Sequence, residues 1–97
     1  MNYMLCRNSV RDYRRWRRVF DSHGDAHRAA GLGLAGLWRP VGGPKDVFFL
    51  FEVRDMRRAR AFIEAPAAHK AGAASGVIEG EYHPVKDAGT VSYRRRG

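Results

Sequence analysis

The hydrophobic residues of this chain follow two spacings, which divide it into short strands and longer helices. A spacing of two, typical of a half-buried strand, predicts strands at residues 3–8, 32–41, 47–53 and 77–85. A spacing of three and four, typical of a helix with one buried side, predicts a helix over residues 10–30 and more helix after Asp55. The predicted order of elements is therefore β-α-β-β-α-β.

Residues at the ends of these segments support the predicted helices. Ser9 is placed to cap the start of the first helix, and Gly31 is a natural stop at its end. Asp55 is the corresponding cap of the second helical region. Pro66 interrupts that region because proline lacks a backbone N–H, so a separate helical piece is expected over residues 67–74.

The first predicted helix is expected to bury a stripe that contains two histidines. The members of this stripe are Tyr13, Trp16, Val19, Phe20, His23, His27 and Ala30. Six arginines lie on the remaining surface of the helix, at positions 11, 14, 15, 17, 18 and 28. Gly24 lies beside the stripe, where it is either simply tolerated or leaves room for a ligand next to the histidines.

The order of elements predicts a ferredoxin-like α+β fold, a four-stranded antiparallel sheet with two helices on one face. The strand at residues 47–53 has apolar side chains on both of its faces, although a sheet with one solvated face normally alternates apolar with polar residues. The second face therefore needs a cover. A second copy of the chain is the simplest one, so we expect a homodimer through the sheet face.

The length of 97 residues fits a single domain, which we place at residues 1–86. Residues 87–97 lack apolar periodicity and are expected to form a disordered basic tail. The lone Cys6 cannot form an internal disulfide, no signal peptide is apparent, and no apolar run is long enough to cross a membrane. These features favour a cytoplasmic protein.

The net charge is +8, from 15 Arg and 3 Lys against 10 acidic residues. Such a surplus can indicate a nucleic-acid partner. The arginines accompany many alanines and glycines, as a GC-rich genome would encode, so we do not expect nucleic acid to be the main partner. A nucleic-acid-binding module stays an alternative, and a contiguous arginine patch with steeply salt-dependent binding would be its signature.

Several short motifs of the chain are similar to those of a known group of proteins. These are Asp12-Tyr13-x-x-Trp16-x-x-x-Phe20-Asp21-x-His23, Arg28, Gly31, Glu52-Val53-x-Asp55, Ala59-x-x-Phe62, Ala65-Pro66 and the run from Ala73 to Val77. Together they resemble small bacterial members of the dimeric α+β barrel superfamily, some of them cyclase-like. The resemblance implies a pocket between the sheet and the helices of each subunit. The superfamily includes monooxygenases, cyclases, isomerases and haem-degrading enzymes, so it does not fix the reaction.

His23 and His27 are four residues apart, so they lie on one side of the helix with their Cβ atoms about 6 Å apart. They are ordinary core residues, or acid–base groups acting on a small organic ligand, or two ligands of a metal that would still need a third. Acid–base chemistry by imidazole needs no cofactor, and we expect none.

The leading hypothesis is a cyclase, isomerase or monooxygenase that acts on an aromatic or polyketide-like molecule, with His23 as the catalytic acid/base. We expect the substrate to be bound by Tyr13, Trp16, Phe20, His27, Trp38 and Arg39. The alternative within the same pocket is a protein that binds a small ligand without transforming it.

Overall fold

The computed structural model describes residues 1–89 of the chain, which form one sheet and four helices. The elements are β1 Asn2–Val10, α1 Tyr13–Ser22, α2 Gly24–Ala29, β2 Leu32–Trp38, β3 Asp46–Val53, α3 Met56–Glu64, α4 Pro66–Ser75 and β4 Val77–Lys86. The strands are antiparallel in the order β2-β3-β1-β4. No helix within residues 1–89 is long and apolar enough to cross a membrane.

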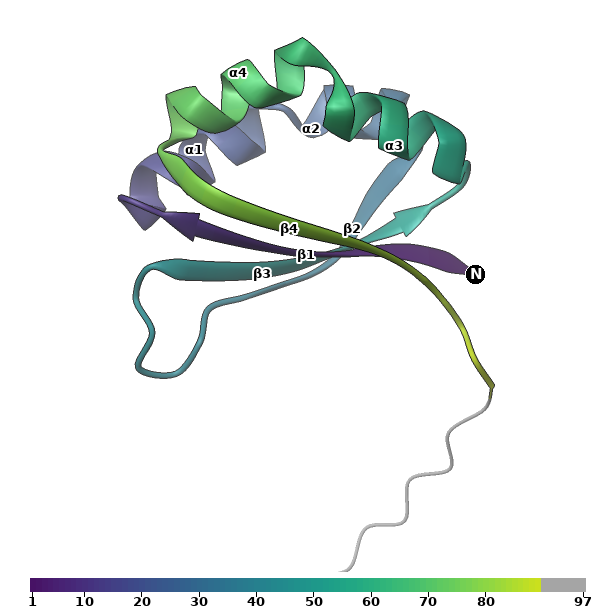
Figure 1. Cartoon of the computed structure of the whole chain (residues 1–97), viewed down its shortest axis with the longest axis horizontal. Helices are drawn as coiled ribbons and strands as arrows, with labels where there is room; N and C mark the ends of the chain where they lie inside the picture. The colour runs from purple at the N-terminus through teal and green to yellow at the C-terminus, as the bar shows by residue number, and fades with distance from the viewer. Residues whose placement is uncertain (90–97) are drawn as a thin grey trace, which may run out of the picture.

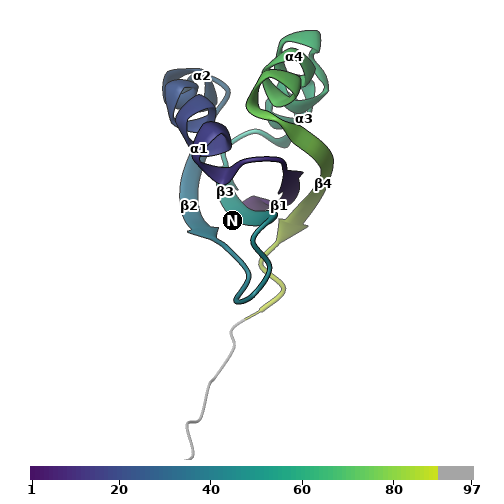
Figure 2. The same cartoon turned by 90° about the vertical axis from the view of Figure 1, so that its left-hand side faces the viewer.

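All four helices lie on the same face of the sheet (Figure 1). Viewed end-on, they form two rows, with α1 and α2 in one row and α3 and α4 in the other (Figure 2). The predicted ferredoxin-like α+β fold is therefore confirmed, with each of its two helices divided into two pieces. The opposite face of the sheet carries no helix and is called the open face below.

The first helix begins later than predicted because β1 is longer than predicted. β1 continues through Ser9 to Val10, so Ser9 is a strand residue rather than a helix cap. The cap is Asp12, whose carboxylate accepts hydrogen bonds from the backbone N–H groups of Arg14 and Arg15 at 3.0 and 3.4 Å.

The first helical region is broken at His23, where the sequence predicted one continuous helix over residues 10–30. The backbone N–H of His23 donates to the Phe20 carbonyl at 3.1 Å rather than to the Val19 carbonyl. The Val19 carbonyl accepts instead from Ser22 Oγ at 2.6 Å and from His23 Nδ1 at 2.8 Å. These side chains compete with the backbone for a carbonyl group, and Gly24 lowers the helix propensity further. The prediction of a single helix is therefore wrong.

The second helical region follows its prediction closely. Asp55 caps α3 by accepting from the backbone N–H groups of Arg57 and Arg58 at 3.0 and 3.3 Å. Pro66 occupies the first turn of α4, where its missing N–H costs nothing. Gly76 ends α4 at φ 83°, a left-handed conformation that favours glycine.

β2 contains a β-bulge that reverses its two faces. The register shifts between Leu34 and Gly36, so Trp38 lies opposite Phe48 on the open face. The Trp38 ring covers Gly36, where a Cβ atom would lie only 2.1 Å from the ring. The predicted strict alternation along residues 32–41 is therefore wrong beyond the bulge, and the strand ends at Trp38.

The C-terminal strand extends past its predicted end. β4 continues through Pro84 to Lys86, and Pro84 is tolerated because β4 is an edge strand. The backbone N–H of Asp87 then donates to the Met1 carbonyl at 3.1 Å. Most of the predicted disordered tail, residues 90–97, lies outside the described residues.

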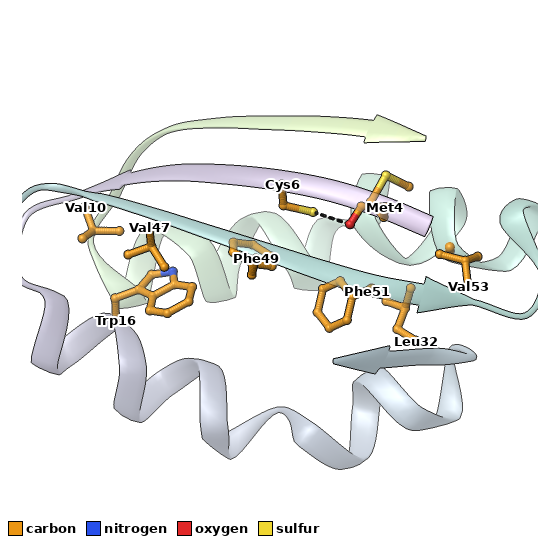
Figure 3. Close-up of a cluster of buried hydrophobic side chains, with 10 residues drawn as sticks. Met4, Cys6, Val10, Trp16, Leu32, Val47, Phe49, Phe51 and Val53 are labelled. Atoms are coloured by element: carbon orange, nitrogen blue, oxygen red, sulfur yellow. Dashed lines mark hydrogen bonds between the residues drawn. The ribbon is translucent and has the colours of Figure 1, made fainter. Parts of the chain in front are cut away.

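The core lies between the sheet and the helices, and rings from α1 and β3 form its centre (Figure 3). Trp16, only 2 % exposed, stacks on Phe20 with ring centroids 4.6 Å apart. Both rings also pack against Phe49, at 5.6 and 5.3 Å. Cys6 is buried as predicted, and burial raises the pKa of its thiol to about 12.

Asn8 is the one buried amide side chain in this core, and it holds two aromatic residues. With its amide oriented to satisfy its neighbours, its oxygen accepts from Trp16 Nε1 at 3.2 Å. Its nitrogen donates to the Tyr82 hydroxyl at 3.3 Å and to the Arg7 carbonyl at 3.1 Å. This amide therefore links β1 to both α1 and β4.

Replacing Asn8 tests this link. We expect Asn8→Ala to lower the free energy of unfolding by about 1–3 kcal/mol, because it leaves the Trp16 indole N–H without a buried acceptor. Urea unfolding followed by tryptophan fluorescence measures the change. Asn2→Ala, at an exposed strand end, is the matched control. Equal stability of Asn8→Ala and wild type would show that the amide holds nothing in place.

Candidate functional site

A cavity of about 230 Å³ lies where the α1–α2 junction crosses β2 and β3. Its lining residues are Phe20, Asp21, Gly24, His27, Arg28, Leu32, Leu34 and Phe51. Four of them are large apolar side chains, and the polar groups are one imidazole, one guanidinium and one carboxylate. The lining is therefore half apolar and half polar, more polar than that of a typical small-molecule site.

His27 is the polar group most closely enclosed by the apolar part of this cavity. Its ring lies 5.0 Å from that of Phe20, 5.1 Å from that of Phe51 and 5.7 Å from that of Phe62. Within residues 1–89, no buried side-chain nitrogen or oxygen lacks a hydrogen-bond partner. The His27 nitrogens have no such partner in that range, so they are open to the cavity or to solvent.

The surroundings of His27 favour its neutral form. Burial lowers its pKa from the ordinary value of 6.5, and the charges of His23 and Arg28 lower it further. At neutral pH the ring is therefore uncharged and has one nitrogen lone pair available to accept a proton.

His23, the predicted catalytic residue, lies at the α1–α2 junction and does not line the cavity. Its Nδ1 donates to the Val19 carbonyl at 2.8 Å, because a carbonyl oxygen can only accept. This bond fixes the ring in a capping position at the end of α1. A catalytic role for His23 stays a prediction, and the placement of the two rings favours His27 for chemistry in the cavity.

The structure places the other predicted binding residues in different parts of the molecule. Phe20 lines the cavity with His27, whereas Trp16 is enclosed in the core beside it. Tyr13 lies further towards the start of α1, where the Arg39 guanidinium carbon is 4.1 Å from its ring centroid. Arg39 also donates to the Pro44 carbonyl at 2.6 Å.

Trp38 is the predicted binding residue that lies on the wrong face of the sheet for this cavity. The β-bulge turns it to the open face, where it is 53 % exposed. Trp38 therefore does not line this cavity, and a substrate-binding role for it stays a prediction.

Sequence analysis missed most of the residues that line the cavity. The exceptions are Phe20 and His27, which were predicted to bind the substrate, and Gly24, whose place next to the histidines suggested room for a ligand. Asp21 and Arg28 seemed part of the solvated side of the helix, and they form exposed pairs with Arg17 and Asp25. Leu34 and Phe51 seemed ordinary strand residues. The structure brings these groups together at one opening, where α1 and α2 meet β2 and β3.

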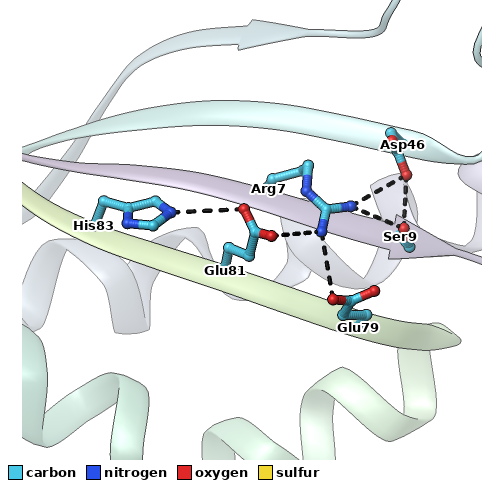
Figure 4. Close-up of polar contacts among 6 residues, drawn as sticks. All are labelled: Arg7, Ser9, Asp46, Glu79, Glu81 and His83. Atoms are coloured by element: carbon cyan, nitrogen blue, oxygen red, sulfur yellow. Dashed lines mark hydrogen bonds and ion pairs between the residues drawn. The ribbon is translucent and has the colours of Figure 1, made fainter.

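Two other clusters of polar groups lie away from the cavity. On the open face, Arg7 donates to Glu81 at 2.8 Å and lies 3.5 Å from Asp46 and 3.6 Å from Glu79 (Figure 4). These carboxylates balance its charge, so Arg7 is not available to the cavity. A second cavity of about 250 Å³ lies between α3 and the β1–β4 edge, beside Arg60, Glu64 and Tyr82, and contains no histidine.

The described residues contain no cluster of three or more His, Cys, Asp or Glu side chains able to hold a metal ion.

Comparison with known proteins identifies the fold. No family model and no curated protein matches the chain. Solved structures do match. A variant of SnoaB from Streptomyces nogalater, described as a cofactor-independent oxygenase, has a TM-score of 0.72 at 14% identity, covering 95% of this chain and 97% of that one.

Two further structures, each provisionally described as an antibiotic biosynthesis monooxygenase, agree with this match. The protein from Bordetella bronchiseptica has a TM-score of 0.72 at 13% identity, covering 90% of this chain and 96% of that one. The protein from Deinococcus radiodurans has a TM-score of 0.68 at 11% identity, covering 98% of this chain and 100% of that one. The chain shares their fold. This fold agrees with the expected resemblance to the dimeric α+β barrel superfamily, and at such identities it does not establish an activity.

The pKa of His27 leads to a prediction about stability in acid. Because the folded-state pKa lies below 6.5, the unfolded chain binds this proton more readily. The His27 contribution to stability is therefore constant above about pH 6.5 and is lost as the pH falls through the folded-state pKa. We expect the melting temperature to fall in this window and His27→Phe to flatten the fall. His69→Phe, on the exposed side of α4, is the control. An unchanged acid sensitivity in His27→Phe would contradict the prediction.

Proposed function

We propose that the protein is an oxygenase-type enzyme that transforms a small, flat organic molecule in the cavity beside His27, without a bound cofactor. The observation that carries this proposal is a neutral imidazole that lines a cavity together with the rings of Phe20 and Phe51. The shared fold with a cofactor-independent oxygenase supports the class of reaction. Cyclisation and isomerisation begin with the same proton transfer, so the proposal also includes cyclases and isomerases that use His27 as the base.

The proposed reaction begins with proton transfer from the substrate to His27. A ring ketone with an acidic C–H gives up this proton to the imidazole, and the resulting enolate is electron-rich. The Arg28 guanidinium, which lines the cavity, can balance the charge that develops on the enolate oxygen.

Molecular oxygen then completes the reaction without another reductant. The enolate carbon forms a bond to one oxygen atom, and protonation gives a hydroperoxide. Loss of water from the hydroperoxide breaks its O–O bond and leaves a second carbonyl group. One CH₂ group and one O₂ thus become one C=O group and one H₂O. All four electrons come from the substrate.

The cavity limits the size and shape of the substrate. Its volume of about 230 Å³ lies below the usual range for drug-sized ligands, which favours a molecule of two or three fused rings at most. The Phe20 and Phe51 rings favour a flat molecule that packs against aromatic side chains.

Oxygen consumption tests the proposal and distinguishes the two histidines. With anthrone and the smaller 1,3-indanedione as substrates, in EDTA, we expect the protein to consume one O₂ per ketone oxidised. His27→Gln should lower the rate by about 10²- to 10⁴-fold, the usual contribution of a general base. His23→Gln, the matched control, should keep most of the rate.

The other outcomes are equally clear. Loss of activity in His23→Gln alone would return the catalytic role to His23. Binding of a ketone at the cavity without oxygen consumption would favour the alternative, a non-catalytic protein that binds a small ligand. If the protein neither binds nor oxidises either ketone, the proposal is contradicted.

We also propose that the protein forms a homodimer through the open face of the sheet. Four large apolar side chains are exposed on this face, those of Leu5, Trp38, Phe48 and Val85. All four helices lie on the opposite face, so no element of the described chain covers these side chains. Exposed apolar patches of this kind mark association surfaces. The Arg7 cluster lies on the same face, and Arg7 is directly opposite Phe48 in the sheet, so a partner chain would also cover these charged side chains (Figure 4).

Sedimentation velocity tests the dimer. Phe48→Glu should raise the dimer dissociation constant by roughly 100-fold or more, because it places an unpaired charge in an apolar interface. Val41→Glu introduces the same charge in the fully exposed β2–β3 connection and should leave the dimer intact. A wild-type protein that is monomeric at micromolar concentration would refute the proposal.

A further inference from the structure

The positive charge of the chain is concentrated in its helical layer. The helices and the segments that join them, residues 11–31 and 54–76, hold eleven Arg and Lys residues against five acidic ones, a net charge of +6. The strands and their connections, residues 1–10, 32–53 and 77–89, hold four basic residues against five acidic ones, a net charge of −1. A solvated surface of mixed charge would not divide in this way between the two layers of the fold.

Most of the helical arginines have no partner within the protein. Two of the five acidic side chains in this layer, Asp12 and Asp55, cap helices, and Asp21 and Asp25 each pair with one arginine. Six arginine side chains have no ion pair and no hydrogen-bond acceptor within residues 1–89. They are Arg11, Arg14, Arg18, Arg54, Arg57 and Arg60. All six are exposed.

The two rows of helices are joined by two further arginines. Arg15 donates to the Ala74 carbonyl at 2.9 Å and so joins α1 to α4. Arg58 donates to the Ala29 carbonyl and joins α3 to the end of α2. The two rows of helices therefore lie side by side above the sheet (Figure 2).

The arginines of α1 are spaced regularly along this surface. Arg14 and Arg18 are four residues apart, so they project from one side of the helix about 6 Å from each other along its axis. Arg11 lies just before the helix, with its side-chain stem beside Gly76 at the end of α4. A row of guanidinium groups at this spacing can contact successive phosphates of a chain, and the guanidinium fork suits phosphate oxygens.

We propose that the outer face of the helical layer is a docking surface for the phosphate backbone of a nucleic-acid duplex. Within residues 1–89, every exposed large hydrophobic residue lies outside the helices. The surface thus lacks the aromatic side chains that stack the bases of a single strand, and the apolar side chains that membrane-surface helices insert into lipid. Backbone contact to a duplex needs neither.

This inference is independent of the cavity and of the proposed reaction. In a dimer formed through the open faces, the two helical layers point outward, and each stays available to a duplex. The surface favours the alternative of a nucleic-acid partner, because the surplus positive charge of the described residues is concentrated in the helical layer.

Fluorescence anisotropy with a labelled 20-base-pair DNA duplex of mixed sequence tests the proposal. For four to five phosphates contacted, we expect the affinity to fall by about 100- to 1,000-fold between 50 and 200 mM salt. Arg14→Gln/Arg18→Gln should weaken binding at 50 mM and lower the slope of log K against log salt by about 2.

Two control variants make the result specific to this surface. Lys45→Gln/Lys86→Gln removes the same charge from the sheet layer and should leave binding nearly unchanged. A variant with Arg94, Arg95 and Arg96 replaced by Gln, in the segment outside the described residues, should keep the salt dependence of the helical surface. Circular dichroism confirms that each variant is folded.

Several results would overturn the inference. These are no duplex binding at 50 mM salt, an equal loss in Arg14→Gln/Arg18→Gln and Lys45→Gln/Lys86→Gln, and complete loss in the variant of residues 94–96 alone. Tighter binding to a single strand of the same sequence would also overturn it. So would binding to phosphatidylserine vesicles without binding to the duplex.

Discussion

The packing of α1 onto β3 is the interaction on which the rest of this structure depends. Trp16 and Phe20 extend from the helix, Phe49 and Phe51 extend from the strand, and the four rings fill the space between the layers. This packing commits one face of β3 to the helices. Since four short helices can cover only that face, the apolar residues on the other side of the same strand are left exposed. The proposed dimer therefore rests on the exposed apolar side of β3.

The row of rings also determines where a ligand can bind. His27 continues the row after Phe20, with Phe51 and Phe62 around it. A straight helix would have carried both histidines along the core. The break at His23 instead uses that imidazole as a cap for the Val19 carbonyl and leaves His27 beside a cavity. The same local competition for one carbonyl group therefore removes one histidine from the cavity and opens the cavity beside the other.

The sequence was sufficient for the features that depend on periodicity. The order of elements along the chain, the single face covered by helices and the burial of Trp16 and Cys6 all follow from which side chains are apolar and at what spacing. Features that depend on one or two hydrogen bonds were not predictable in this way. The break at His23 rests on side chains that are compatible with a continuous helix, and the bulge at residue 35 inserts one residue without a change in composition.

Those two irregularities explain which candidate site residues the sequence could identify. Phe20 and His27 lie on the periodic part of α1 and reach the cavity as a helix would carry them. Trp38 lies beyond the bulge. Strict alternation along the strand therefore places it on the same face as Leu32, whereas the structure places it on the open face. Asp21 and Arg28 belong to the polar side of an ideal helix, and both line the opening although neither is part of the predicted buried stripe.

The irregularities do not change the division of charge between the two layers, because this division depends only on which elements are helices. The inner side of each helix packs against the core, so the arginines of that helix lie on its outer side. The acidic residues of the sheet lie largely on the open face, and Arg7 already balances three of them. The fold thus separates an outer cationic surface from a nearly neutral sheet. An anionic partner of this protein would approach the helices, whereas a second copy would approach the sheet.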